Sequence, residues 1–563
     1  MSYTMQIDNT NTTIETIFSS LKTPEEKVAF WANIRKTDMR MKQFIDEVLA
    51  THIRGEIGNN PVASTDSYKA SQFNMFNDEQ FDEDGLKERL VEMYAFIEPR
   101  KGAKHSHVVV AGVQVVTKQL ANICVTMKHI KDMICFYASH FSTPTYDGRY
   151  TFNPYPWLKV VLEYDGKLPL QLHGLPEGTI VSVAVPIVTL ESVDSDCAQL
   201  VSHFEGLVQK AIWYPTTVAT NALAISSVIL NALKQTATDE VIASWLPFAI
   251  QDFGYRAVTS EESATIGGLA ALYITMGSDT VTAVALAMDT LSGGSMVGYS
   301  VAACEHNQAF SKGRKGEFKF IKRLITETYP SGILSVVADT YDTEANVEMI
   351  TTGELRDLIL ARDGTYVIRP DSQLLNEDGT EMTPAETISK IFSILDKNLK
   401  EFNTVNEKGF KVLNKKYKVI YGDGLTPEKI KQVLKRMVAD GWCASNIVFG
   451  VGGNLLQNVT RDTERFAMKA SQLVFEVENT NGNVWMEVRD TCKETPGKQS
   501  KKGRFHICSK DGVIQCFDTK DATKPDLPNM LEMYFSKGEV VHKLDDLSTI
   551  RERISDYRNL YGF

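Results

Sequence analysis

Four short apolar runs along the chain each end in polar or glycine-rich residues. They are LSVVAD (334–339), YVIRPDS (366–372), YKVIYGDG (417–424) and NIVFGVGG (446–453). Each apolar stretch has the length and β-branched content of a buried strand, and amphipathic helical patterns lie between several of them. Strands that alternate with helices predict a parallel sheet, either open or closed into a barrel.

Charged side chains and glycines follow these predicted strands. In parallel sheets, ligands bind at the carboxyl ends of the strands, so residues in this position are candidate ligand contacts. The residues found there are Asp339, Arg369, Asp371, Asp423, Gly452 and Gly453. Carboxylates, a guanidinium and a glycine pair that converge on one rim suit a phosphorylated sugar. The pattern therefore indicates an enzyme.

The chain divides into four segments. Residues 1–60 are predicted to form a separate helical element, because Thr23-Pro24-Glu25-Glu26 has the sequence of a helix-capping box. Residues 61–203 mix helical and strand-like patterns, as in an α+β domain, and residues 204–480 carry the strand–helix alternation. Residues 481–563 are polar, rich in glycine and lysine, and end in short strand-like and helical pieces.

Composition restricts the class of protein. The 563 residues allow about two to four domains, and 43% hydrophobic residues supply ample core. A net charge of −11 gives no reason to expect a nucleic-acid partner. No apolar stretch approaches the roughly 20 residues of a membrane helix, and the N-terminus lacks the pattern of a secretory signal. The eight cysteines are scattered without a C-x-x-C pair, so we expect a soluble cytoplasmic protein.

Histidines are candidates for chemistry. His306 lies beside Glu305, and Asp339 at a neighbouring strand end can hold the tautomer of its imidazole and raise its basicity. A structural role and a catalytic role both fit this context. His105 and His107 form an H-x-H pair, but no third metal ligand is in view, so we expect them in a solvated loop.

The glycine-rich segment 450–453 resembles a turn that holds a phosphate. Glycines let backbone N–H groups approach an anion, and the start of the next helix favours negative charge. Arg461 and Lys469, on the helical stretch predicted to follow, add cationic donors. The alternative is a tight turn with solvated surface charges. The basic run GKQSKKGR (497–504) is either a solvated face or a polyphosphate clamp, and both interpretations stay open.

From about residue 62 to 545 the chain resembles the nicotinamide phosphoribosyltransferases, a branch of the type II phosphoribosyltransferases. The motifs that carry the resemblance follow one another in order along the chain. They are TDSYK (65–69), FIEPR (96–100), LPEGT (175–179), WYPTTVATN (213–221), QDFGYR (251–256), GSDTV (277–281), GYSVAACEH (298–306), VVADTYD (336–342), IRPDS (368–372), YGDG (421–424), GVGGNLLQNVTRD (450–462) and SKKGR (500–504). So many ordered motifs are not expected by chance.

The resemblance implies an irregular, TIM-like α/β barrel beside a second α+β domain that is built from N- and C-terminal segments. The helical extension of residues 1–60 would be added to this core. A homodimer with active sites shared between its subunits is also implied. The implied reaction joins nicotinamide to phosphoribosyl pyrophosphate and gives nicotinamide mononucleotide and pyrophosphate. Mg²⁺ would take part, and ATP as co-substrate would phosphorylate a histidine.

The resemblance assigns several residues to the nicotinamide ring. Phe253 and Tyr68 would sandwich it, with Tyr68 coming from the partner subunit, because offset stacking suits a flat heteroaromatic ring. Asp279 would accept a hydrogen bond from the carboxamide. Nicotinate would place a carboxylate against this carboxylate, so Asp279 should disfavour it. The other residues near the ring would be Arg256, Ser335 and Arg369.

Other residues would hold the sugar, the phosphates and the catalytic histidine. The ribose and its 5′-phosphate would contact Asp371, Gly422, Asp423, Gly452, Gly453, Arg461 and Lys469. The pyrophosphate, with Mg²⁺ held mainly by its own oxygens, would meet Arg100, Arg369, Arg489 and Lys498. The catalytic set would be the phosphorylatable His306 with Glu305, Asp339 and Asp371.

Three alternatives stay open. ADP-ribose pyrophosphate as donor would give NAD directly, and departures from the family pattern do cluster near the 5′-phosphate turn, at Val451, Asn454 and Ala467. Ala467 removes a potential phosphate hydroxyl. A nicotinate-specific enzyme is disfavoured by Asp279, and a non-catalytic binding protein would be expected to lose charged residues that are present here. Residues 1–60 and the segment 373–382 also exceed the family core.

Overall fold

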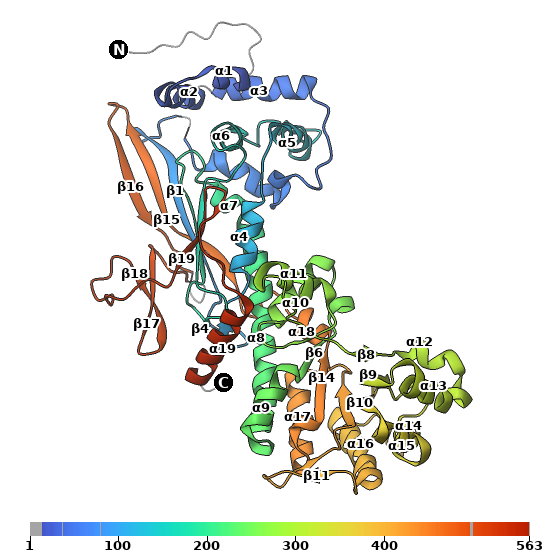
Figure 1. Cartoon of the computed structure of the whole chain (residues 1–563). Helices are drawn as coiled ribbons and strands as arrows, with labels where there is room; N and C mark the ends of the chain where they lie inside the picture. The colour runs from blue at the N-terminus through green and yellow to red at the C-terminus, as the bar shows by residue number, and fades with distance from the viewer. Residues whose placement is uncertain (1–13, 37, 79, 496–498, 562–563) are drawn as a thin grey trace.

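The computed structural model describes residues 14–36, 38–78, 80–495 and 499–561 (Figure 1). Two seven-stranded sheets organise the chain. Figure 1 shows a parallel sheet surrounded by helices at the lower right and an antiparallel sheet at the upper left. This arrangement confirms the predicted α/β fold with a second α+β domain.

The parallel sheet has the strand order β7-β6-β14-β13-β10-β9-β8. Its strands are β6 (Ile250–Asp252), β7 (Gly277–Ser278), β8 (Ala302–Ala303), β9 (Ser331–Val337), β10 (Asp363–Arg369), β13 (Tyr417–Tyr421) and β14 (Ile447–Val451). The segment before β8 bonds back to β7, because Ser278 N donates to Tyr299 O at 3.0 Å and Tyr299 N donates to Met276 O at 2.7 Å. The sheet therefore curls so far that the segment leading into one edge strand, β8, bonds to the other edge strand, β7. All its carboxyl ends lie on one rim.

Helices cover the outer face of the curled sheet. They are α8 (Glu205–Thr236), α10 (Glu261–Ala271), α11 (Val281–Leu291), α14 (Thr343–Thr351), α15 (Gly353–Ala361), α16 (Pro384–Leu399) and α17 (Pro427–Ala439). Local signals define where they begin: Thr383 and Glu386 cap α16 reciprocally, and the Thr426 hydroxyl accepts a hydrogen bond from Lys429 N at 3.3 Å. Apolar residues on one face of α16 and of α17 are buried in the core they share with the sheet.

The antiparallel sheet has the order β16-β15-β1-β5-β3-β19-β20 and uses both ends of the chain. Its strands are β1 (Leu86–Glu98), β3 (Leu170–Gly174), β5 (Val188–Ser192), β15 (Ala467–Asn479), β16 (Val484–Asp490), β19 (Glu532–Ser536) and β20 (Glu539–Val540). The predicted origin of the second domain in N- and C-terminal segments is thereby confirmed. Strand β15 lies inside the segment 204–480 yet pairs with β1 along its length, so this part of the segment joins the second sheet.

The N-terminal extension forms the helices α1 (Ile14–Ser20), α2 (Pro24–Lys36) and α3 (Asp38–Thr51). The predicted capping box is present: Thr23 N donates to Glu26 Oε2 at 3.0 Å, and Glu26 N donates to Thr23 Oγ1 at 3.2 Å. Trp31 is buried and meets Tyr155 edge-on at a centroid distance of 5.6 Å. The extension is therefore packed onto the body of the protein through aromatic contacts.

Helix α8 corrects the expectation that no segment has the length and apolarity of a membrane helix. It spans 32 residues, and its most apolar window has a mean hydropathy of 1.4. Of that window, 72% is buried inside the protein. Its side chains take part in both main cores, so burial by protein accounts for its composition.

A buried carboxylate joins the two domains. Glu177 is fully buried, and its carboxylate accepts hydrogen bonds from Gly112 N at 3.1 Å and Gln114 N at 2.9 Å, at the start of α4 (Val113–Ala121). Burial raises the pKa of Glu177 to about 7, although these bonds and one from Tyr273, just after α10, lower it. The carboxyl group therefore titrates close to neutral pH.

We expect Glu177→Gln to change how the stability depends on pH. The folded pKa of about 7 exceeds the ordinary 4.5, so the contribution of Glu177 is fully present below pH 4.5 and is lost as the pH rises through 7. This difference between the folded and the ordinary pKa corresponds to roughly 3 kcal/mol in the free energy of unfolding. Because an amide does not titrate, the melting temperature of the variant should fall less than that of the wild type between pH 5 and pH 8. Parallel pH profiles for the two proteins would contradict this role.

Candidate active site

Every strand of the parallel sheet contributes to the rim at its carboxyl end. Most residues predicted from the strand pattern and the resemblance lie there because they follow directly on a strand. In chain order they are Phe253 after β6, Asp279 after β7, Glu305 and His306 after β8, Asp339 after β9, Arg369 and Asp371 after or at the end of β10, Gly422 and Asp423 after β13, and Gly452 and Gly453 after β14. Ser335 is buried within β9.

His306 faces two carboxylates. Its Nε2 lies 3.7 Å from Asp339 Oδ1 and 4.0 Å from Asp371 Oδ2, while its Nδ1 lies 3.2 Å from Thr340 Oγ1. The imidazole is 37% exposed, so a substrate can reach it. Asp339 Oδ1 is buried without a hydrogen-bond partner within the described residues, and its other oxygen accepts from Ser372. Asp339, Asp371 and Thr340 therefore surround both ring nitrogens of His306 with oxygen atoms.

Glu305 lies next to His306 but points elsewhere. Its carboxylate accepts a hydrogen bond from Asn307 Nδ2 at 3.0 Å and lies 3.9 Å from Arg256 Nη1. Asp371 Oδ2 is instead the group that connects His306 to Arg369, whose Nη2 is 3.7 Å away. Asp339 and Asp371 therefore flank the imidazole, and Glu305 takes its contacts from other groups.

Phe253 lies over the glycines of two neighbouring strands. A Cβ atom on Gly450 would come 2.1 Å from Phe253 Cε2, and one on Gly422 would come 3.4 Å from it. Only glycine at position 450 leaves room for this ring. The glycine segment that we interpreted as a phosphate turn therefore also seats the aromatic side chain.

Asp279 directly follows β7, which pairs with β6 on the side away from β14. Gln251 Nε2 donates to Asp279 Oδ1 at 2.8 Å, and Ser300 Oγ donates to the same oxygen at 2.5 Å. Behind the sheet, the buried Asp252 accepts from Thr280 Oγ1 at 2.7 Å, and its own carbonyl accepts from Asp279 N at 3.0 Å. Burial raises the pKa of Asp252.

Two of these contacts were missed by sequence reasoning. Gln251 lies in β6, two residues before Phe253, which directly follows the strand. Side chains two positions apart along an extended backbone face the same side, so this spacing was a usable signal. Ser300 gave no such signal, because it belongs to the irregular segment that closes the sheet between β7 and β8.

A second group of predicted residues lies in the other domain. Tyr68, in the 3₁₀ helix η2 (Ser67–Met75), is 58% exposed, and Lys69 Nζ lies 5.4 Å from its ring centroid. Lys469 belongs to strand β15, which corrects the prediction that it follows Arg461 on a helix, since α18 (Gly453–Leu456) ends first. Burial lowers the pKa of Lys469, and the charge of Arg100 adds to this effect. These cations suit an anionic ligand.

Arg489 of the predicted pyrophosphate site is paired with carboxylates, and so are two cations of the basic run. Arg489 Nη1 donates to Glu88 Oε2 at 2.8 Å, and Arg489 Nε donates to Glu487 Oε1 at 2.8 Å. In the basic run, Lys501 pairs with Glu98 at 2.7 Å, and Arg504 pairs with Glu92 and Glu191. Lys498 lies outside the described residues. Lys501 and Arg504 therefore form ion pairs within the chain, which neither interpretation of this run had predicted.

The two groups are separate within one chain. Figure 1 shows β1 and β15 in the second domain, away from the ends of β9 and β10. Within the described residues, no hydrogen bond or ion pair joins Tyr68 or Arg100 to a residue of the rim. Arg461, which pairs with Asp462 at 3.1 Å, lies in the connection from α18 to β15.

The H-x-H pair does not form part of a metal cluster. His107 begins strand β2 (His107–Val109), and His105 Nδ1 lies 2.6 Å from Oε1 of the buried Glu464. The expectation of a solvated loop is wrong for His107, which begins a strand. His105 does lie in a loop, but its ring contacts this buried carboxylate instead of being fully solvated. Among the described residues, no group of three or more histidine, cysteine, aspartate or glutamate side chains is arranged to hold a metal ion.

Comparisons with known proteins identify the family. A model described as the nicotinate phosphoribosyltransferase (NAPRTase) family matches residues 248–529, and the nicotinamide phosphoribosyltransferase N-terminal domain matches residues 60–172. The chain belongs to the nicotinate phosphoribosyltransferase family. A nicotinamide phosphoribosyltransferase from Xanthomonas campestris is 33% identical over 453 residues, which cover 80% of this chain and 87% of that protein. One from Mycoplasma pneumoniae is 33% identical over 358 residues, covering 62% and 74%.

The fold of this phosphoribosyltransferase is shared with a solved structure. Nicotinate-nucleotide pyrophosphorylase from Pyrococcus furiosus superposes with a TM-score of 0.53, covering 91% of this chain and 99% of that one. Its sequence is 16% identical, so the likeness shows the fold alone.

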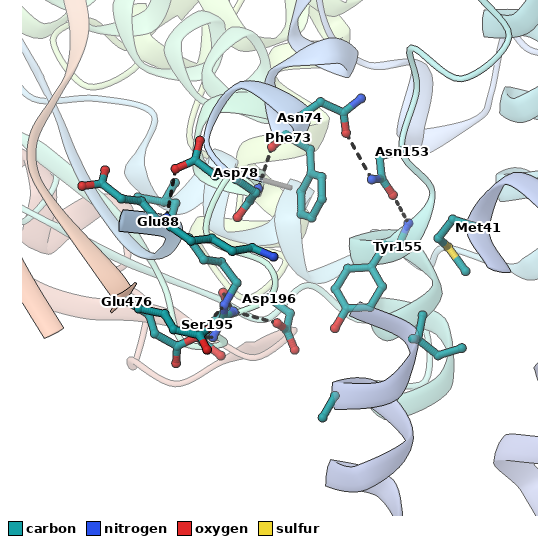
Figure 2. Close-up of a pocket in the computed structure, with 17 residues that line it drawn as sticks. Met41, Phe73, Asn74, Asp78, Glu88, Asn153, Tyr155, Ser195, Asp196 and Glu476 are labelled. Carbon is teal, nitrogen blue, oxygen red and sulfur yellow. Dashed lines mark hydrogen bonds and ion pairs between the residues drawn. The ribbon is translucent and has the colours of Figure 1, made fainter. Parts of the chain in front are cut away.

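A cavity of about 300 Å³ lies away from the rim of this phosphoribosyltransferase, between the helical extension and the antiparallel sheet (Figure 2). Its polar groups bind one another: Asn153 Nδ2 donates to Asn74 Oδ1 at 3.1 Å, and Arg89 pairs with Asp196 at 2.9 Å and Glu476 at 3.1 Å. None of the predicted site residues lines it. The cavity is therefore distinct from the rim.

Proposed function

We propose that this chain is a nicotinamide phosphoribosyltransferase of NAD salvage, which joins nicotinamide to phosphoribosyl pyrophosphate and releases pyrophosphate. The observation that carries the proposal is the position of Asp279: it directly follows β7, as Phe253 directly follows the neighbouring β6, and its carboxylate is held by neutral donors. A flat ring that bears a carboxamide fits this pair, because the ring can stack and the amide N–H can donate.

The rim supports the chemistry of the transfer. Displacement of pyrophosphate from the anomeric carbon develops positive charge on the ribose, and Asp371, between Arg369 and His306, presents a carboxylate to it. Negative charge develops on the leaving group. Arg369 at the rim, with Lys469 and Arg100 from the second domain, would stabilise that charge.

We further propose that Tyr68, Arg100 and Lys469 complete the rim of a partner subunit in a cytoplasmic homodimer. The support is their separation from the rim of their own chain and the exposure of Tyr68. Mg²⁺ would arrive on the pyrophosphate, where it neutralises charge, because no dedicated cluster of ligands is present among the described residues. ATP would be a co-substrate that phosphorylates His306.

Base choice tests the proposal. Asp279→Asn should narrow the preference for nicotinamide over nicotinate, because the repulsion between two carboxylates disappears. The loss of this repulsion is worth roughly 1–3 kcal/mol, about five- to 150-fold in the ratio of kcat/KM values. Steady-state kinetics with both bases measures it. Equal use of both bases by the wild type would contradict the role of Asp279.

One observation favours a second donor, ADP-ribose pyrophosphate. Near the glycine turn, Asn454 Nδ2 donates to Leu425 O at 2.8 Å and its Oδ1 accepts from Asn458, while Ala467 has no hydroxyl. Neither side chain is set to bind a terminal 5′-phosphate. Incubation with nicotinamide and each donor, followed by mass spectrometry of the product, separates nicotinamide mononucleotide from NAD.

A further inference from the structure

The carboxylate of Asp279 is held in place by neutral groups. Oδ1 receives two hydrogen bonds, from Gln251 Nε2 at 2.8 Å and from Ser300 Oγ at 2.5 Å. No lysine, arginine or histidine forms an ion pair with Asp279 among the described residues, so these two donors are its side-chain partners there. With Oδ1 occupied, Oδ2 remains to accept a hydrogen bond from a ligand.

Gln251 reaches Asp279 across the backbone of Gly277, which has no side chain to block it. Its strand β6 pairs in parallel with β7, and Gln251 stands opposite Gly277 in the register. A Cβ atom on Gly277 would lie 2.4 Å from Gln251 Oε1, so a side chain there would displace the amide. Gln251 Nε2 also lies 3.4 Å from Tyr299 O, which fixes which end of the amide faces Asp279. A nitrogen between two acceptor oxygens can only be the donor end.

We infer that Gln251 is a positioning residue that sets the choice between a carboxamide and a carboxylate on the base, acting through Asp279 together with Ser300. The inference rests on the proposed function. Hydrogen bonds to a carboxylate are stronger than bonds between neutral groups, so these two donors fix the orientation of Asp279. A carboxylate fixed in this way accepts from a carboxamide and repels a carboxylate. Without Gln251, the carboxylate can turn and lose this selectivity.

The test compares kcat/KM for nicotinamide and nicotinate in four variants. Gln251→Leu removes the amide at similar size, and Ser300→Ala removes the second donor. Ser300→Thr keeps a hydroxyl, and Gln515→Leu makes the same change as the first variant at an exposed position on β18 (Val513–Asp518) of the second domain. Circular dichroism and thermal unfolding check that each variant is folded.

We expect Gln251→Leu to narrow the ratio of nicotinamide to nicotinate kcat/KM roughly tenfold, mainly through the KM for nicotinamide. Ser300→Ala should shift the ratio in the same direction, whereas Ser300→Thr and Gln515→Leu should leave it unchanged. An equal fall for both bases with an unchanged ratio would overturn the inference, since it would mark Gln251 as merely structural.

A result that contradicts the proposed function can be distinguished from one that contradicts the inference. If the wild type transfers nicotinamide from neither donor, the proposed function is contradicted, and calorimetric binding of nicotinamide and of nicotinate then replaces turnover as the readout. A folded Gln251→Leu protein that retains the wild-type ratio of the two affinities would overturn the inference in that case. A narrowed ratio would support it.

Discussion

His306→Ala should abolish the acid-labile phosphate that ATP introduces into this protein. The imidazole is 37% exposed at the rim, and its Nε2 faces Asp339 and Asp371 at 3.7 and 4.0 Å. Thr340 Oγ1, at 3.2 Å from Nδ1, holds the other ring nitrogen. Nε2 is therefore the nitrogen available to accept a phosphoryl group. Incubation with radiolabelled ATP, followed by acid and base treatment, measures the label.

Transfer without ATP should persist in part in this variant. The proposed stacking of the base on Phe253 and the charge of Asp371 would remain, and positioning and charge stabilisation supply much of such catalysis. His105→Ala is the matched control, because His105 contacts the buried Glu464 away from the rim and should keep full labelling. A fully labelled His306→Ala protein would refute the assignment, as would equal loss of label in His105→Ala.

The rim could be predicted from the sequence because its signals are local. A β-branched run that ends in a charged residue or a glycine places that residue at the carboxyl end of a strand, and parallel topology then brings these ends together. Asp339, Asp371 and Gly452 were found in this way. The same reasoning could not show that Glu305 turns away from His306, because a side-chain direction depends on contacts with Asn307 and Arg256.

Contacts between distant segments could not be predicted in this way. Arg489 and Glu88 are 401 positions apart, and only the pairing of β1, β15 and β16 brings them together. Lys469 was expected on a helix because it follows a glycine turn. Its segment instead forms strand β15, which pairs with β1. Strand pairing between distant segments therefore determined the structure of this segment, against its local helical pattern.

Mixing two inactive variants should restore activity if Tyr68 completes the site of a partner subunit. Tyr68 is 58% exposed on η2, and among the described residues it forms no hydrogen bond or ion pair with its own rim. Asp371 lies at the rim between Arg369 and His306. Tyr68→Ala would remove one face of the proposed base sandwich, and Asp371→Ala would remove the carboxylate proposed to face the ribose. Each homodimer should therefore be nearly inactive.

A heterodimer of the two variants has one site with both lesions and one with neither. Statistical mixing makes half of all dimers heterodimers, so activity should approach about a quarter of the wild-type value per total sites, as expected for an isologous dimer. Subunit exchange is verified by native mass spectrometry of differently tagged chains. Phe253→Ala in place of Tyr68→Ala is the control, because Phe253 and Asp371 lie on the same rim and the mixture should stay inactive. No recovery after verified exchange would place Tyr68 outside the partner's site.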